Sequence, residues 1–411
     1  MRAVVTLLLI GTVACGDDGN TPLDGNVDVG PDGTDLCQPQ GATGQFIRRA
    51  GNPQLLPHQT FTDGKLDTEI SDPDVRWTGQ RWDVFYGTGH TTSYTSSDKI
   101  AVIRRASTID RMTWTIEDEP ALTQSSDPGA WDHALVAAPT VIENPSAPPD
   151  RRYLMLYAGS DGTFPYMGYS RQNFQIGAAF SADGVTFTRI TAEQSPHDKP
   201  GLVLTGRQVY PTATNGIVAD PDVVLVGGVY HLFFSSYACA GPQCQTVENN
   251  GIAHATSADG ITWTIVEAPV RSLLRASADP KSGGAQPSVI YDEARCRWEI
   301  WLSNDLPVEI SAQTINVTVT AGVWHSSSTN GNAWDSINYA FARELAWSAS
   351  EPGEGLGMQA GIEVGNNGSG RLMLFTGLDD ENIPVGFTLP LRVGGTTPGV
   401  RTLGVATRDL P

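Results

Sequence analysis

A short element recurs five times along the chain and constrains its fold more than any other feature. In four copies a residue is followed by proline, then by a polar residue and by valine, and a short aromatic or aliphatic run follows after a turn. Repeats of this kind build architectures in which each unit covers the open face of its neighbour. The copies begin at Asp72, Ala138, Asp220, Gln286 and, with alanine in place of proline, Gln359.

Each copy continues into further strand-like runs. Helical periodicity is nearly absent, and short β-rich segments alternate with turns rich in Gly, Pro, Asn and Asp. In three copies a Ser-x-Asp/Asn-Gly turn suited to a tight hairpin leads to an aromatic residue, at 181–187, 257–263 and 328–334. We interpret this turn as a folding element, with Phe187 and Trp263 packing between units.

Four-stranded sheets repeated about every seventy residues predict an all-β fold, a five-bladed β-propeller over residues 45–411. Proline suits the start of each first strand because it removes only a terminal ladder donor. A β-sandwich is the structural alternative, but it would not explain the repeat. The fifth copy is degenerate, and the sequence does not indicate how the ring closes.

The first residues are typical of export. A basic residue precedes an apolar run too short to span a bilayer, so residues 1–14 predict a signal peptide. Residues 12–15 read Thr-Val-Ala-Cys, which resembles a bacterial lipobox with Cys15 as the acylated residue. We expect an exported protein, lipid-anchored to the outer membrane or cell surface through Cys15. Thr12 departs from the usual leucine, so a periplasmic or secreted protein is the alternative.

Residues 15–44 form an acidic segment rich in Gly and Asp, which we interpret as a disordered tether. The whole chain has a formal net charge of −19. Acidity of this size argues against nucleic acid as a partner, since phosphate recognition needs clustered Lys and Arg. We expect a monomer with a carbohydrate ligand and no membrane contact beyond the lipid.

The cysteines fit an oxidising compartment. Cys239 and Cys244 lie five residues apart, which suits a local disulfide, and Cys37 and Cys296 are left to form a second. No His or second CxxC pair lies at the spacing of a zinc site. We expect no metal or other cofactor, with a structural calcium ion as the alternative.

The residues before the prolines should converge around the propeller axis and line a pocket. Amides and carboxylates of this kind bind sugar hydroxyls, and aromatic rings stack on the apolar face of a sugar. Asp74 and Asp222 share the face of Asp72 and Asp220, although they could also cap blade edges. The predicted substrate-binding residues are Trp131, His133, Gln286, Gln359, Asp74 and Asp222.

From about residue 60 to the end, the sequence resembles the five-bladed propeller glycoside hydrolases of families 43, 32, 62 and 68. The resemblance rests on the Asp-Pro blade starts and on the Ser-x-Asp-Gly-x-Thr-aromatic turn. In family 43 it implies an Asp base on the first blade, a tuning Asp on the second and a Glu acid on the third. By blade order the catalytic candidates are Asp72, Asp132 and Asp220. Asp132 lacks the Asp-Pro context of the family, and Asp220 is an aspartate where the family has its glutamate.

Two functions follow. The first is an exported glycoside hydrolase that cleaves arabinose-, xylose- or fructose-containing glycans with an acid–base pair of carboxyl groups. The acid could instead be Glu248, Glu351 or Glu354. The second is a non-catalytic propeller that binds glycan or protein. An aspartate at a strand start is also ordinary turn chemistry, so each candidate has a structural alternative.

Other motifs favour no further function. His254 and His325 align in the third strands, and we interpret them as satisfied strand histidines rather than as a central site. The Asp-Gly turn resembles the sialidase Asp-box but is one residue shorter, and no arginine triad accompanies it. Serine-nucleophile, phosphate-loop and zinc-protease motifs are missing from the sequence.

Overall fold

The computed structural model describes twelve stretches of the chain, and all the strands named below lie within them. These stretches are 47–48, 60–93, 96–110, 113–162, 173–240, 246–274, 283–293, 295–303, 322–342, 360–364, 370–379 and 400–409. Within them, no helix is long and apolar enough to cross a membrane.

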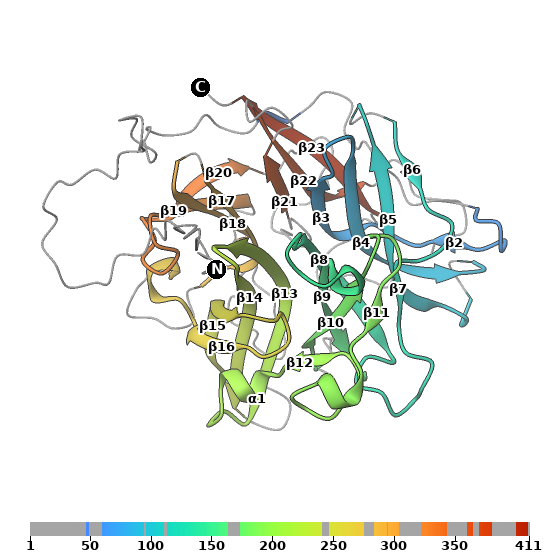
Figure 1. Cartoon of the computed structure of the whole chain (residues 1–411), viewed down its shortest axis with the longest axis horizontal. Helices are drawn as coiled ribbons and strands as arrows, with labels where there is room; N and C mark the ends of the chain where they lie inside the picture. The colour runs from blue at the N-terminus through green and yellow to red at the C-terminus, as the bar shows by residue number, and fades with distance from the viewer. Residues whose placement is uncertain are drawn as a thin grey trace, which may run out of the picture.

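The described strands form five antiparallel sheets, each continuous in sequence except for the one that joins the two ends of the chain (Figure 1). The first contains β2 (Leu66–Asp67), β3 (Ser71–Trp77), β4 (Trp82–Thr91), β5 (Ile100–Thr108), β6 (Thr115–Ile116) and β7 (Leu122–Thr123). The second contains β8 (Leu135–Glu143), β9 (Tyr153–Ser160), β10 (Gln175–Ser181), β11 (Thr188–Arg189) and β12 (Leu202–Leu204).

The next two sheets have four strands each. The third is β13 (Asn215–Val226), β14 (Val229–Ala240), β15 (Thr246–Ser257) and β16 (Thr264–Glu267), and the fourth is β17 (Ala285–Asp292), β18 (Arg297–Ser303), β19 (Gly322–Ser328) and β20 (Asn338–Ala342). The described helices are short: α1 (Gly206–Val209) and the 3-10 turns η1 (Pro149–Arg151), η2 (Ala192–Gln194) and η3 (Arg271–Leu273).

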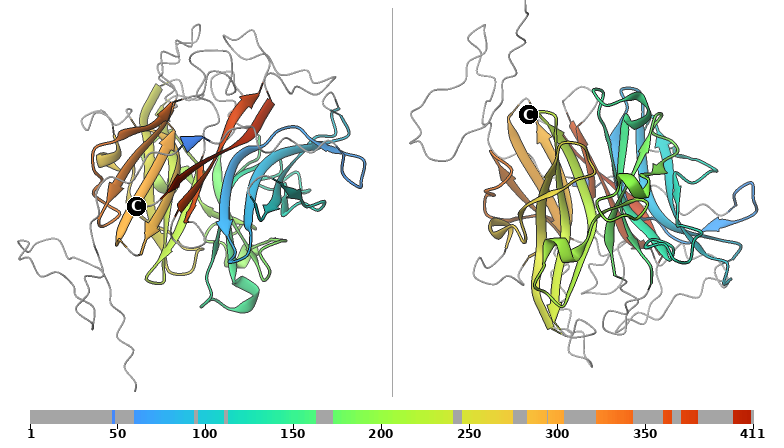
Figure 2. Two further views of the ribbon diagram at one scale, coloured as in Figure 1. Left: turned by 90° about the horizontal axis from the view of Figure 1, so that it is seen from above. Right: turned by 60° about the horizontal axis from the view of Figure 1, so that its bottom comes forward.

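The first strands of these four sheets follow one another, with β3 against β8, β8 against β13 and β13 against β17. The sheets fan out from this row of strands in a propeller-like arrangement (Figure 2). The predicted all-β propeller-like fold is therefore confirmed.

Four blades are recognisable, one fewer than the five predicted. The remaining sheet is β1 (Ile47–Arg48), β23 (Val400–Asp409), β22 (Gly370–Asp379) and β21 (Ala360–Val364), in that order. It contains the degenerate fifth copy, which has neither the proline nor the polar third residue of the others. This sheet differs from the others in that its fourth strand, β1, comes from the start of the chain.

Each of the four first strands is bulged at its residue–proline pair. The ladder register shifts at this point in β3, β8, β13 and β17 because proline has no N–H to donate to the neighbouring strand. The residue before each proline has a positive φ, a backbone conformation that residues other than glycine rarely adopt. The φ values are 51° at Asp72, 45° at Ala138, 49° at Asp220 and 53° at Gln286.

The third residue of the first three copies connects one blade to the next. Asp74 Oδ2 accepts a hydrogen bond from Val141 N at 2.8 Å, and Thr140 Oγ1 accepts one from Val223 N at 3.3 Å. Asp222 Oδ2 in turn accepts from Val289 N.

These bonds run from β3 to β8, from β8 to β13 and from β13 to β17. Thr140 Oγ1 also donates to Asp222 Oδ1 at 3.1 Å, so the side chains are linked to each other as well. We call Asp74, Thr140, Asp222 and the three backbone N–H groups that they hold the inter-blade latch. It fixes the register between successive blades close to the axis.

The Asp-Gly turn is a folding element, as predicted. In residues 257–263 the Ser257 hydroxyl accepts from Gly260 N at 2.9 Å, and Asp259 Oδ1 accepts from Ile261 N and Thr262 N at 2.8 Å each. The same bonds recur in the 181–187 and 328–334 copies. The aromatic residue that ends each turn is buried between blades, where Phe187 packs edge-to-face on Phe85.

A fourth copy of this turn lies in the first blade. Thr108 donates to Asp110 Oδ1 at 2.9 Å, and Asp110 Oδ1 accepts from Thr113 N at 2.7 Å, directly before Trp114. The spacing matches the other copies, but Arg111 stands where they have glycine. That substitution hides the copy from a search for Asp-Gly.

We expect Thr140→Val to reduce the free energy of unfolding by about 1–3 kcal/mol. Valine keeps the shape but removes the hydroxyl, so Val223 N–H loses its acceptor and Asp222 loses a donor in a buried environment. Denaturant titration of the full chain measures the change. Thr212→Val, at an exposed position, is the control and should change the value by less than about 0.5 kcal/mol. Equal effects of the two substitutions would contradict the latch.

Candidate functional site

Two of the residues that precede the prolines meet across the molecule. Gln286 Nε2 donates to Asp72 Oδ1 at 3.4 Å, although the two residues lie 214 positions apart. Gln286 is held in place by its own backbone N–H, which donates to Ser235 Oγ at 2.8 Å. The prediction that these positions converge is therefore confirmed for Asp72 and Gln286.

The other predicted axial positions differ in what they offer. Asp220 is half-buried on β13 and has the same backbone conformation as Asp72. Ala138 is buried in a small cluster with Ala158 and Ala219, and it brings no polar group. Gln359 lies outside the described residues. Ala138 has the same positive φ but no polar side chain. This backbone conformation is therefore a structural feature of the repeat, and it does not by itself indicate a catalytic residue.

Asp74 and Asp222 belong to the latch. We predicted them as sugar ligands, but their oxygens accept from the backbone N–H groups of Val141 and Val289 and from the Thr140 hydroxyl. Burial raises the pKa of Asp74 from 3.8 to about 7, although the Val141 N–H and Arg76 oppose the shift. Burial raises the pKa of Asp222 as well, and the neighbouring Asp74 carboxylate adds to that rise.

Asp132 lies in a buried polar cluster of the second blade. Its Oδ2 accepts from Arg189 Nε at 2.7 Å and from the Tyr157 hydroxyl at 2.9 Å, and only 1% of the residue is exposed. An aspartate held by an arginine and a tyrosine in this way is committed to the packing of its own blade.

The first blade repeats this cluster. Asp67 Oδ1 accepts from Arg104 Nε at 3.2 Å, and Asp67 Oδ2 accepts from the Tyr86 hydroxyl at 3.4 Å. Tyr86 and Tyr157 end the same aromatic run in their blades, and Asp67 and Asp132 precede the first strand of each. The internal match indicates that Asp132 is a structural counterpart of Asp67, and its catalytic role stays a prediction.

The two neighbours of Asp132 lie differently. The Trp131 indole N–H donates to the Pro200 carbonyl at 2.9 Å, and its ring stacks on Tyr157 with the centroids 5.7 Å apart. His133 is half-buried, with Nδ1 3.1 Å from the Ala130 carbonyl oxygen. Trp131 therefore has a fixed orientation.

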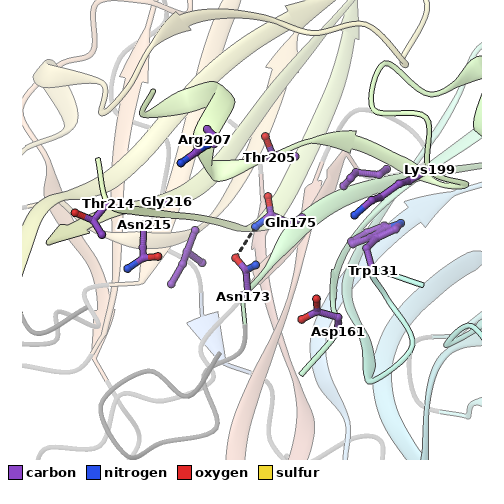
Figure 3. A pocket seen from close by; sticks show the side chains of 12 residues that line it. Trp131, Asp161, Asn173, Gln175, Lys199, Thr205, Arg207, Thr214, Asn215 and Gly216 are labelled. Carbon is purple, nitrogen blue, oxygen red and sulfur yellow. Dashed lines mark hydrogen bonds between the residues drawn. The ribbon is translucent and has the colours of Figure 1, made fainter. Parts of the chain in front are cut away.

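Trp131 forms one wall of a pocket between the second and third blades (Figure 3). The pocket has a volume of about 340 Å³ and is lined by the ends of β9, β10, β12, α1 and β13. Its polar lining comprises Asp161, Asn173, Gln175, Lys199, Thr205, Arg207, Thr214 and Asn215.

The repeat did not predict this pocket, because the residues before the prolines do not line it. In an antiparallel sheet the third strand runs parallel to the first, so β10 begins at the same end of the blade as β8. Polar residues just before a third strand and at its first position, such as Asn173 and Gln175, were the signal that could have revealed it.

The remaining candidates lie away from these groups or outside the described residues. Glu248 is described and exposed, whereas Glu351 and Glu354 are not described. His254 stacks on Phe233 at 4.3 Å and lies 3.2 Å from His231, and burial lowers its pKa to about 3. His325 lies 3.1 Å from Glu299 Oε2. Both histidines are satisfied within their blades, as predicted.

Metal and disulfide predictions stay largely untested. The described stretches contain no group of three or more His, Cys, Asp or Glu side chains arranged to hold a metal ion. Cys239 and Cys296 are described, but their predicted partners Cys244 and Cys37 are not. Both pairings therefore remain predictions.

No protein family and no curated protein matches this chain. Solved structures do resemble it. A putative glycoside hydrolase from Parabacteroides distasonis is 12% identical, with a TM-score of 0.56 over 90% of this chain and 98% of that one. A thermostable family-43 glycoside hydrolase is 13% identical, with a TM-score of 0.50 over 84% of this chain and 90% of that one.

The structure of BT0996, an RGII complex, is 12% identical, with a TM-score of 0.53 over 86% of this chain and 91% of that one. At these identities the likeness shows the fold alone. The chain thus has the propeller-like fold of solved glycoside hydrolases.

We expect Asp132→Asn to lower the free energy of unfolding by about 3 kcal/mol, because Arg189 loses the charge that compensates it in a largely buried pair. Asp67→Asn should have a similar effect in the first blade. Denaturant titration of both variants gives the comparison. A purely catalytic role would leave the unfolding energy of Asp132→Asn at the wild-type value.

The raised pKa values of Asp74 and Asp222 predict that the stability of the fold depends on pH. Between 3.8, the pKa of a free Asp, and about 7, the folded state keeps protons that the unfolded chain has released. Their contribution to the free energy of unfolding is therefore greatest below this window and is lost as the pH rises through it.

We expect Asp74→Asn combined with Asp222→Asn to flatten this decline, because asparagine keeps an acceptor oxygen without ionising. Thermal unfolding at pH 4.5 and pH 7.5 measures it, with the exposed Asp150→Asn as control. If the double variant loses as much stability as the wild type between the two pH values, the latch carboxyls are not the titrating groups.

Proposed function

We propose that the protein hydrolyses glycosidic bonds at the axial end of its blades, where the residues before the prolines converge. The observation that carries this proposal is the contact between the Gln286 amide and the Asp72 carboxylate. Two separate blades supply a carboxylate and an amide to one place, and that pair of groups binds and activates hydroxyl-bearing ligands.

Asp72 is the proposed general base. It is half-buried, and the N–H of the Gln286 amide donates to its Oδ1. Asp220 is the proposed acid, because it supplies the carboxyl group at the position before the proline of the third blade. Asp132 has no part in this proposal because Arg189 and Tyr157 occupy its Oδ2.

The substrate class that we propose is a glycan with arabinose, xylose or fructose residues. The propeller-like fold shared with solved glycoside hydrolases supports it. A separation between the two carboxyl groups of about 6.5–9.5 Å would give inversion, and one of about 5 Å would give retention of the anomeric configuration.

Glycan binding without catalysis is the second candidate. Ala138 favours it, because the second blade offers a methyl group at the axial position where a hydrolase would gain a polar side chain. The third blade has an aspartate in place of the glutamate of family 43, which shortens the reach of the acid.

We also propose that the sheet containing β21 acts as a fifth blade that closes the ring. The support is that β21 contacts both β17 and β3, the first strands on either side of it. Export and a lipid on Cys15 are part of the same proposal, and they rest on the sequence of residues 1–15.

The test is hydrolysis of arabinan, xylan and fructan oligosaccharides by the full chain. We expect Asp72→Asn to lower kcat/KM by about 10²–10⁴-fold, because removal of a general base costs that much. Asp220→Asn should also lower it. Asp150→Asn makes the same change at an exposed position in η1 and should leave kcat/KM unchanged.

Equal rates for wild type and both axial variants would contradict the hydrolase proposal. Binding of a glycan that Asp72→Asn weakens, with no product released, would instead favour the second candidate.

A further inference from the structure

The pocket between the second and third blades has no role in the hydrolysis proposed above. Asp72, Ala138, Asp220 and Gln286 do not contribute to its lining. Its volume of about 340 Å³ falls at the lower end of the range for small-molecule sites. A pocket of this size suits one or two sugar rings.

The middle of the pocket is preorganised. Gln175 Oε1 accepts from Gly206 N at 2.8 Å, and Gln175 Nε2 donates to Asn173 Oδ1 at 2.8 Å. Both ends of the Gln175 amide are therefore fixed, and the Asn173 Oδ1 atom has its donor. The Asn173 NH₂ group is left to donate to a ligand. Thr205 Oγ1 accepts from Gln208 N, which leaves its hydroxyl hydrogen to donate as well.

Two cations lie in the lining, Lys199 and Arg207. Both are exposed, and neither forms an ion pair with a described carboxylate. The chain as a whole has a net charge of −19, so two cations beside one pocket make this part of the surface positive against an acidic background. Figure 3 shows Lys199 beside Trp131, with Arg207 across the pocket from Asp161.

The remaining walls suit a pyranose. Trp131 is held by Pro200 and Tyr157 and supplies a rigid aromatic wall. Asp161 and Asn215 add polar side chains to the lining, and Figure 3 shows Asp161 on the side of the pocket opposite Arg207.

We propose that this pocket is a second carbohydrate site, separate from the axis, and that it binds a uronic acid residue with its carboxylate between Lys199 and Arg207. A planar guanidinium matches the geometry of a carboxylate, while the Asn173 amide and the Thr205 hydroxyl donate to the ring oxygens and hydroxyls. The site recognises a charge that the axial carboxylates would repel. It does not depend on hydrolysis at Asp72.

The test compares trigalacturonate with its fully methyl-esterified form, which differs in charge, by titration calorimetry on the full chain. We expect the acid to bind at least tenfold more tightly than the ester, and the difference to shrink at high salt because both cations are exposed. Lys199→Gln combined with Arg207→Gln should remove the difference. Arg271→Gln, an exposed arginine outside the pocket, should preserve it.

Asp72→Asn separates this site from the axial one, and we expect it to leave trigalacturonate affinity unchanged. The proposal is overturned if acid and ester bind equally, if neither binds, or if the double variant binds the acid like the wild type. It is also overturned if Asp72→Asn removes the binding. A protein that binds trigalacturonate but hydrolyses nothing would contradict only the proposed function.

Discussion

The arrangement of the blades depends on one kind of hydrogen bond, from a backbone N–H of one first strand to a side chain of the strand before it. Asp74, Thr140 and Asp222 each make this bond close to the axis. Proline creates the need for this bond. It stands directly before each latch residue, and because it has no N–H it cannot donate to the neighbouring strand of its own blade. The latch thus replaces, between blades, part of the regular pairing that proline removes within them. It also orients the residues before the prolines toward the axis.

This arrangement separates structural from chemical roles along the four-residue element. The third residue is committed to the latch, and the first is left for the axis, where Gln286 reaches Asp72. The same separation holds for the cluster at Asp132, which the first blade duplicates at Asp67. The proposed acidic-sugar pocket does not include the axial residues, although its wall Trp131 stacks on Tyr157 of the Asp132 cluster. A catalytic step at the axis and a binding step in the pocket could therefore be altered independently.

The fold was predictable from sequence because the residue–proline pairs and the Asp-Gly turns are local signals that recur. The axial contact of Asp72 with Gln286 followed from the same repeat. The roles of Asp74 and Asp132 did not, because an aspartate's neighbours depend on which blade packs against it. The pocket at Gln175 was missed since its residues come from loops and strand starts that share no motif. The Thr108 turn escaped notice because Arg111 replaces the expected glycine.

The pairing of β1 with β23 has a consequence for how the protein is made. Ile47 and Arg48 pair with Thr407 and Ala406, so the first described strand pairs with the last described strand. A ribosome must therefore synthesise more than 350 residues before this contact can form. The intervening blades can form their own strand pairs and the inter-blade latch in the meantime. Loss of residues 400–409 would leave β1 and β22 with unpaired edges.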